Sequence, residues 1–126
     1  MKVIVPANDS PELYACVASI RLHEPALPII VVTDGEIGLP PGCARVIGVQ
    51  PFIFARNVNL GLRVCQGDDV VIINQDARLE TAGGLTSLLR LPYDIIAPGI
   101  VGECGLPDQQ WQGRVEPVAL DMLCFI

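Results

Sequence analysis

Carboxylate and carboxamide side chains follow three apolar segments of this chain, close to the point where each segment ends. They are Asn8 and Asp9, Asp34, and Asn74, Gln75 and Asp76. Taken one at a time, such residues commonly cap helices or form turns. Three such groups gathered at one edge of a sheet favour a polar binding site instead.

Asp76 carries the most specific chemistry of this set. It comes soon after residues 70–73, four β-branched residues in a row that predict a buried strand. A hard divalent cation binds one or two carboxylates and completes its shell with phosphate oxygens and water. A cation at Asp76 would let this acidic protein bind a diphosphate and would act on that diphosphate as a Lewis acid.

Short apolar runs alternate with helical patterns along the chain. Strands are predicted at residues 2–5, 27–33, 44–49 and 70–73, with an edge or bulged strand at 95–101 and a final apolar run at 118–126. Helices are predicted at residues 11–23, 52–66 and 80–90. The first helix has Ser10 as its N-cap and Pro11 at its first position, and Glu24-Pro25 ends it.

The second and third helices each have an expected apolar face. In the second helix this face comprises Phe54, Val58, Gly61, Leu62 and Cys65. In the third helix it comprises Leu85, Leu88 and Leu89. The Gly83-Gly84 pair weakens the third helix, because glycine is a poor helix former.

Strands alternating with helices predict an α/β fold, a three-layer α/β/α domain with a mostly parallel sheet. In such sheets ligands bind beyond the carboxyl ends of the strands, where the polar residues above lie. Neither G-x-G-x-x-G nor G-x-x-x-x-G-K-[ST] occurs, which argues against a dinucleotide fold and a P-loop.

The composition is that of one globular domain, residues 1–126. Hydrophobic residues make up 51% and charged residues 17%, and the formal net charge is −6 without a basic stripe, so nucleic acid is not an expected partner. The first residues do not form a signal peptide, and no apolar run is long enough to span a membrane. We expect a cytoplasmic protein whose five cysteines are mostly buried, reduced thiols.

Four segments, in order and with matching gaps, resemble the family 2 glycosyltransferases of the GT-A fold, over residues 3 to about 101. Residues 3–9 are similar to that family's opening strand and P-x-Y-N turn, and residues 30–35 to its strand that ends in an acidic pair. Residues 54–62 are similar to its A-x-N-x-G helix, and residues 70–77 to its metal-binding D-x-D strand, here in an N-x-D form.

The resemblance implies a nucleotide-sugar donor, a carbohydrate or lipid-linked acceptor, and a role in polysaccharide biosynthesis. It implies that a nucleotide cradle is formed by Pro6, Ala7, Asn8 and Asp9, and that the base is contacted by Asp34. It also implies that Arg56 and Asn59 lie near the nucleotide, and that Mg²⁺ or Mn²⁺ is bound by Asp76 with Asn74.

This sequence departs from the family pattern at several positions. Asn8 stands where an aromatic residue is usual, Asp9 where asparagine is usual, and Thr33 where the first acid of the pair is usual. Asn74 replaces the first aspartate of D-x-D, which leaves one carboxylate for the cation. A general base is not identified, and we expect the acceptor-side part of the fold to be missing from these residues.

Two other classes of protein remain open. One is a non-catalytic module that binds a nucleotide or nucleotide sugar and lacks the general base. The other is a flavodoxin-like regulatory domain whose acidic residues only cap helices. An apolar strand at the end of the chain would also favour pairing with a second copy, so a homo-oligomer is a further expectation.

Overall fold

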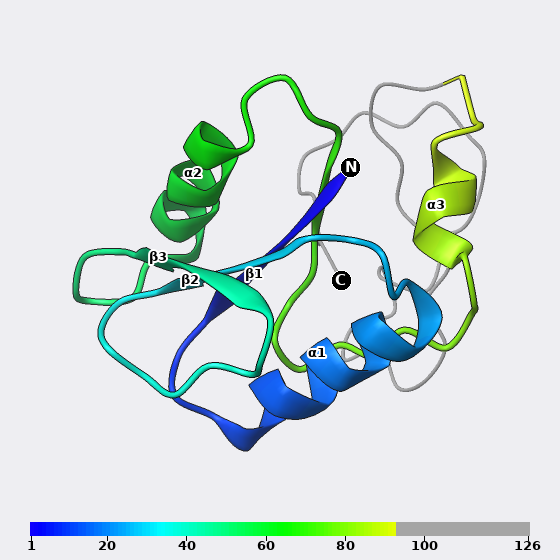
Figure 1. Cartoon of the computed structure of the whole chain (residues 1–126). Coiled ribbons are helices and arrows are strands. Elements are labelled where there is room, and N and C mark those ends of the chain that lie inside the picture. Colours follow the sequence, from blue (N-terminus) through cyan, green and yellow to red (C-terminus); the bar gives the residue numbers. More distant parts are fainter. Residues whose placement is uncertain (93–126) are drawn as a thin grey trace, which may run out of the picture.

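The computed structural model describes residues 1–92, which form a parallel β-sheet with helices (Figure 1). In chain order the elements are β1 (Lys2–Ala7), α1 (Pro11–His23), β2 (Ile29–Thr33), β3 (Cys43–Ile47), α2 (Phe54–Val64), β4 (Val70–Ile72) and α3 (Gly84–Leu88). The four strands pair in the order β3-β2-β1-β4, and every pair is parallel. The predicted α/β class and parallel sheet are therefore confirmed.

β1 and β2 form the centre of the sheet and are buried on both faces. Val3 and Val5 pack with Val31 and the residues of α1 on one face. Ile4 packs with Ile30, Val32 and Cys65 on the opposite face. Continuous runs of β-branched residues suit such central strands, because neither face meets water.

α1 covers the first face of the sheet and begins as predicted. The Ser10 hydroxyl accepts a hydrogen bond from the Glu12 backbone N–H, and Pro11 occupies the first turn. The buried residues of the helix recur at helical spacing and are Leu13, Cys16, Val17 and Ile20. The backbone N–H of Glu24 then caps the end of the helix by donating to the carbonyl of Ile20, 2.7 Å away.

α2 covers the opposite face, so the arrangement is compatible with a three-layer α/β/α fold (Figure 1). Its buried residues are Asn57, Val58 and Gly61. A Cβ atom placed on Gly61 would lie 2.7 Å from Cγ2 of Ile4 and 3.1 Å from Cγ2 of Val32. Glycine at this position therefore lets the helix approach the sheet closely.

The apolar faces predicted for α2 and α3 are partly wrong. Phe54 and Leu62 are 37% and 40% exposed, because Asn57, Val58 and Gly61 form the buried stripe of α2 instead. α3 is much shorter than the predicted helix 80–90, since Gly83 adopts a left-handed conformation with φ 66° and prevents an earlier start. Leu89, beyond its end, is 47% exposed.

The predicted strand at 95–101, the loop that follows it and the apolar run at 118–126 lie outside the described residues. So do Cys104 and Cys124, while Cys16 and Cys65 are buried and Cys43 is half-buried, all three as free thiols. Among residues 1–92, no helix has the length and apolar character needed to cross a membrane.

Candidate functional site

The three predicted groups of polar residues do meet at one edge of the sheet. Ala7, the last residue of β1, is paired with Thr33, the last residue of β2. Ile4 is paired with Ile72, so β4 ends level with the middle of β1, and hydrogen bonds between Asn8 and Gln75 join the residues that follow the two strands. Parallel strands necessarily bring the residues that follow them to the same side.

The end of β1 and the end of β4 form the point at which the strand order reverses. From β1 the chain passes through α1 to β2 and then to β3 on one side, and α2 returns it to β4 on the other side of β1. α1 and α2 lie on opposite faces of the sheet (Figure 1), and the strand order reverses between β1 and β4. Ligands of open α/β sheets bind at such a reversal point.

A hollow of about 200 Å³ lies at this reversal point and is open to solvent. Its lining comes from three segments, which are the end of β1, the end of β4 and the start of α2. The lining residues are Pro6, Asn8, Phe52, Phe54, Asn74, Gln75 and Asp76. Four of these, Pro6, Asn8, Asn74 and Asp76, were predicted as site residues.

Asn8 and Gln75 connect the two strand ends through a pair of hydrogen bonds. The Asn8 backbone N–H donates to Oε1 of Gln75 at 2.8 Å, and Nε2 of Gln75 donates to Oδ1 of Asn8 at 2.6 Å. Both side chains therefore hold the residues after β1 and after β4 together. Asn8, predicted as part of the nucleotide cradle, has a clear structural role in the unliganded protein.

Asn74 and Asp76 line the β4 side of the hollow, and both side chains carry oxygen atoms. Oδ1 of Asn74 is buried and has no hydrogen-bond partner among the described residues. The backbone of Asn74 is held in place, since its carbonyl accepts from the Ala77 N–H at 3.0 Å and from Sγ of Cys16 at 3.5 Å. Asp76 is exposed and adds a carboxylate to the same lining.

This donor set fits a hard divalent cation, which prefers carboxylate and carbonyl oxygens. An unpartnered buried carbonyl oxygen costs free energy, and a cation would offset that cost. In residues 1–92 no group of three or more His, Cys, Asp or Glu side chains gathers to hold a metal ion. A cation here would therefore take the remaining positions of its shell from a ligand and from water.

Five other predicted site residues do not line the hollow. Ala7 is fully buried in the core on the α1 side, and Asp9 and Asn59 are exposed elsewhere. Asp34 is half-buried in the turn after β2, where the Thr33 hydroxyl donates to the Gly35 carbonyl at 2.6 Å. The fifth is Arg56.

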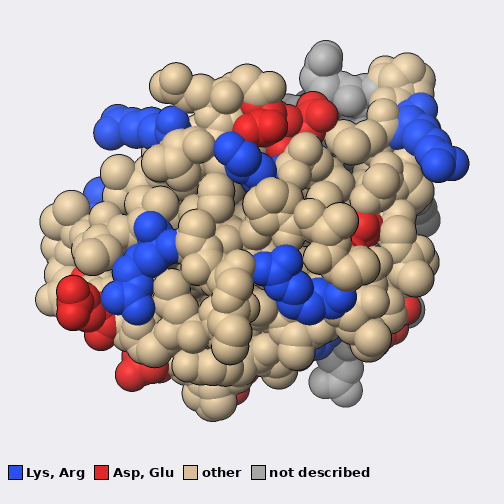
Figure 2. All heavy atoms as spheres, in the orientation of Figure 1, with Lys and Arg blue, Asp and Glu red and all other residues tan. Residues whose placement is uncertain are grey.

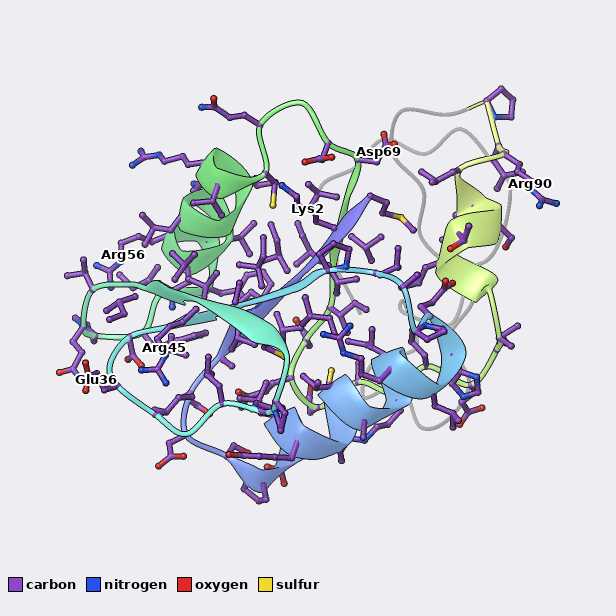
Figure 3. The ribbon with its side chains drawn as sticks, viewed as in Figure 1. Lys2, Glu36, Arg45, Arg56, Asp69 and Arg90 are labelled. Atoms are coloured by element: carbon purple, nitrogen blue, oxygen red, sulfur yellow. The ribbon has the colours of Figure 1, made fainter. Side chains whose placement is uncertain are left out.

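Arg56 lies at the start of α2, beside the loop that follows β3 (Figure 3). Its Nη2 donates hydrogen bonds to the backbone carbonyls of Val49 and Pro51 in that loop. The guanidinium group therefore holds the loop rather than pointing a free charge into the hollow.

Phe52, Phe54 and Gln75 also line the hollow. Gln75 was part of a predicted polar group but was given no role of its own, and neither phenylalanine was predicted as a binding residue. The signal for Gln75 was its place between Asn74 and Asp76. Phe54 was predicted on the apolar face of a helix over residues 52–66, whereas the helix begins only at Phe54, and both Phe52 and Phe54 line the hollow.

The electrostatics of the region suit a cation-dependent site rather than direct attraction of an anion. On the face drawn in Figure 2, the Lys and Arg side chains form separate small groups and not a continuous stripe. Burial raises the pKa of the Cys16 thiol to about 11, so this thiol beneath the site stays protonated and is a poor nucleophile.

Comparison with known proteins adds no relative. No family model matches the chain, and no curated protein matches it. The geometry of the hollow and the residues that line it are therefore the basis for inferring a function.

Proposed function

We propose that this chain binds a nucleoside diphosphate sugar together with Mg²⁺ or Mn²⁺ in the hollow between β1 and β4. In this proposal the domain is of the GT-A type, and it transfers the sugar to a hydroxyl group of a carbohydrate or lipid-linked acceptor. The observation that carries the proposal is that Asn74, whose buried Oδ1 has no partner among the described residues, lines the hollow together with Asp76. These residues lie where parallel α/β sheets bind their ligands.

The residues of the chain have distinct roles in this proposal. Oδ1 of Asn74 and the carboxylate of Asp76 would hold the cation, and the fixed backbone of Asn74 keeps its oxygen in position. The Asn8–Gln75 hydrogen bonds connect the residues that follow β1 and β4. When bound, the cation supplies Lewis-acid stabilisation of the negative charge on the diphosphate leaving group.

A second candidate is a nucleotide-sugar binding module without transferase activity. One observation favours it, because Asp76 is the one carboxylate among the described residues that line the hollow. If the cation occupies Asp76, no carboxylate of this lining is free to act as a general base toward an acceptor.

Thermal unfolding tests both candidates. The melting temperature is measured with UDP, GDP and dTDP, each with and without Mn²⁺. Ligands that bind the native state raise it, so we expect at least one nucleotide to raise it in a Mn²⁺-dependent manner. Asp76→Asn should abolish this increase, whereas Asp69→Asn, an exposed aspartate just before β4 and at the opposite edge of the sheet, should retain it.

Absence of any nucleotide-dependent increase in the wild-type protein would refute both candidates. An increase that survives Asp76→Asn would refute the assigned cation site. Release of sugar from a labelled donor, by hydrolysis or by transfer, then distinguishes the enzyme from the binding module.

A further inference from the structure

Two phenylalanine residues on the α2 side line the hollow together with the oxygen-bearing side chains on the β4 side. Phe54 is the first residue of α2 and is 37% exposed, and Phe52 lies in the loop just before it. Aromatic rings that line an open hollow together with a few polar groups are typical of small-molecule sites. The two walls therefore differ in chemistry, one apolar and aromatic, the other rich in oxygen.

The loop that carries Phe52 is held at both ends. At its start, the Gly48 N–H donates to the carbonyl of Thr33. A Cβ atom on Gly48 would lie 2.7 Å from Oδ1 of the buried Asn57 and 3.0 Å from that same carbonyl, so only glycine fits. Nearer Phe52, Arg56 donates to the carbonyls of Val49 and Pro51. The aromatic wall is thus positioned before any ligand arrives.

The two walls define the shape of a ligand that fits both. One end must bear oxygens that share a cation with Asn74 and Asp76, and the other must present a flat apolar surface to the phenylalanine rings. A hollow of about 200 Å³ is smaller than the usual range for a whole ligand, so it encloses only part of such a molecule. A nucleobase is flat, and it stacks on aromatic side chains with substantial affinity.

We infer that Phe52 and Phe54 form a platform for the nucleobase and that Arg56 is a positioning residue for this platform. The inference rests on the proposed function, because it assigns the opposite end of the ligand to the cation site. This assignment differs from the base contact that the resemblance implied at Asp34, which does not line the hollow. Arg56 acts on the ligand only indirectly, because its guanidinium group donates hydrogen bonds to the loop carbonyls.

Calorimetric titration in the presence of Mn²⁺ tests the platform by comparing UDP, GDP and dTDP with pyrophosphate, which lacks a base. Phe54→Leu and Phe52→Leu should each weaken binding of the preferred nucleotide about 5- to 100-fold. Binding of pyrophosphate should stay within about twofold of wild type, since the cation site is untouched. Phe54→Tyr should retain nucleotide binding, because it keeps the ring.

Leu62→Ala is the matched control, since Leu62 is an exposed apolar residue of α2 outside the hollow. It should leave both affinities unchanged. Equal losses for nucleotide and pyrophosphate in the phenylalanine variants would overturn the platform. So would a loss confined to a nucleotide sugar with its nucleotide unaffected, because the rings would then contact the sugar.

Arg56→Lys tests the positioning role. It should weaken nucleotide binding and spare pyrophosphate, whereas a direct contact between Arg56 and phosphate predicts an equal loss for both. If wild-type protein binds no pyrophosphate with Mn²⁺, the cation site of the proposed function fails. Titration with uridine, guanosine and thymidine then decides the platform separately: phenylalanine-dependent binding supports it, and no binding overturns it.

Discussion

Asn74 is the residue whose chemical type matters most for the proposed cation site. A carboxamide oxygen at this position can bind a cation but brings no charge, so Asp76 alone supplies negative charge to the lining. Without a ligand, the buried Oδ1 of Asn74 has no partner among the described residues. Burying such an atom without a hydrogen bond costs free energy, and a ligand that pairs with it would remove that cost.

Replacing Asn74 by aspartate should raise the affinity for a cation and lower the stability of the cation-free protein. A second carboxylate close to Asp76 raises the charge of the site, so Mn²⁺ should bind roughly tenfold more tightly. In the presence of a chelator the same carboxylate is buried without a partner, and the melting temperature should fall. Thermal unfolding with chelator and with Mn²⁺ measures both effects.

Asn59→Asp is the control for this substitution, because Asn59 is exposed on α2 and does not line the hollow. It should change neither the affinity for Mn²⁺ nor the melting temperature in chelator by much. An Asn74→Asp variant whose melting temperature is insensitive to Mn²⁺ would count against a cation at this position.

Cys16 should make the stability of the protein fall at alkaline pH. Burial raises the pKa of its thiol from 9.0 to about 11 in the folded state. Below pH 9 the thiol is neutral in both states and has no effect. As the pH rises from 9 to about 11, the unfolded chain ionises first, so the free energy of unfolding decreases.

Urea unfolding on either side of this pH range measures the decrease, and Cys16→Ala should make it smaller. Cys43→Ala serves as the comparison, because Cys43 is only half-buried and should contribute less. An unchanged pH dependence in Cys16→Ala would show that other groups cause the decrease.

At the scale of the elements, α2 is the helix that connects the packing of the sheet with the site. Its buried stripe lies on the sheet, while its first residue, Phe54, lines the hollow. The close approach at Gly61 sets how near α2 lies to β1 and β2. A helix displaced from the sheet would therefore also move the aromatic wall.

Gly61→Ala should destabilise the protein by about 1–2 kcal/mol. At an exposed helical position the same change would stabilise by about 1 kcal/mol, since alanine is the better helix former. Here the new Cβ atom would lie 2.7 Å from Cγ2 of Ile4, so overpacking opposes that gain. Urea unfolding measures the difference.

Asn59→Ala is the matched substitution on the exposed side of α2 and should raise stability by a few tenths of a kcal/mol. A stabilising Gly61→Ala would show that the helix can move away from Ile4 at little cost.

At the scale of the whole molecule, the segment after β4 returns across α1 and is attached to it by polar contacts. The Leu79 N–H donates to the Ser19 hydroxyl at 3.0 Å, and the Gly83 N–H donates to the His23 carbonyl at 2.9 Å. The buried Glu24 carboxylate accepts from the backbone N–H and the hydroxyl of Thr86, at 2.9 and 2.6 Å. These bonds attach α3 to the end of α1.

Glu24→Ala should destabilise the protein by about 1–3 kcal/mol, because it removes the two hydrogen bonds that Thr86 donates to the buried Glu24 side chain. Glu24→Gln keeps one acceptor oxygen and should cost less. A double-mutant cycle of Glu24→Ala with Thr86→Val, followed by urea unfolding, should give a coupling energy of at least about 0.5 kcal/mol. Strict additivity would show that the two residues act independently.

Much of the fold follows from local patterns in the sequence. Runs of β-branched residues identified β1, β2 and β4, and Ser10-Pro11 located the start of α1 within a residue. Parallel pairing then brings Asn8, Asn74 and Asp76 to one edge, because consecutive parallel strands must end on the same side. These features depend on residues that are close in the sequence and on the spacing of apolar residues along it.

Only the tertiary structure shows which of these residues line the same hollow and which of them are already engaged in hydrogen bonds. Strand order separates Asp34, which follows β2, from the hollow between β1 and β4. Hydrogen bonds between distant segments engage Asn8 with Gln75 and Arg56 with the loop carbonyls, and the packing of α2 leaves Phe54 at the hollow rather than in the core. Sequence periodicity cannot reveal such contacts, because they join residues whose separation along the chain bears no relation to their separation in space.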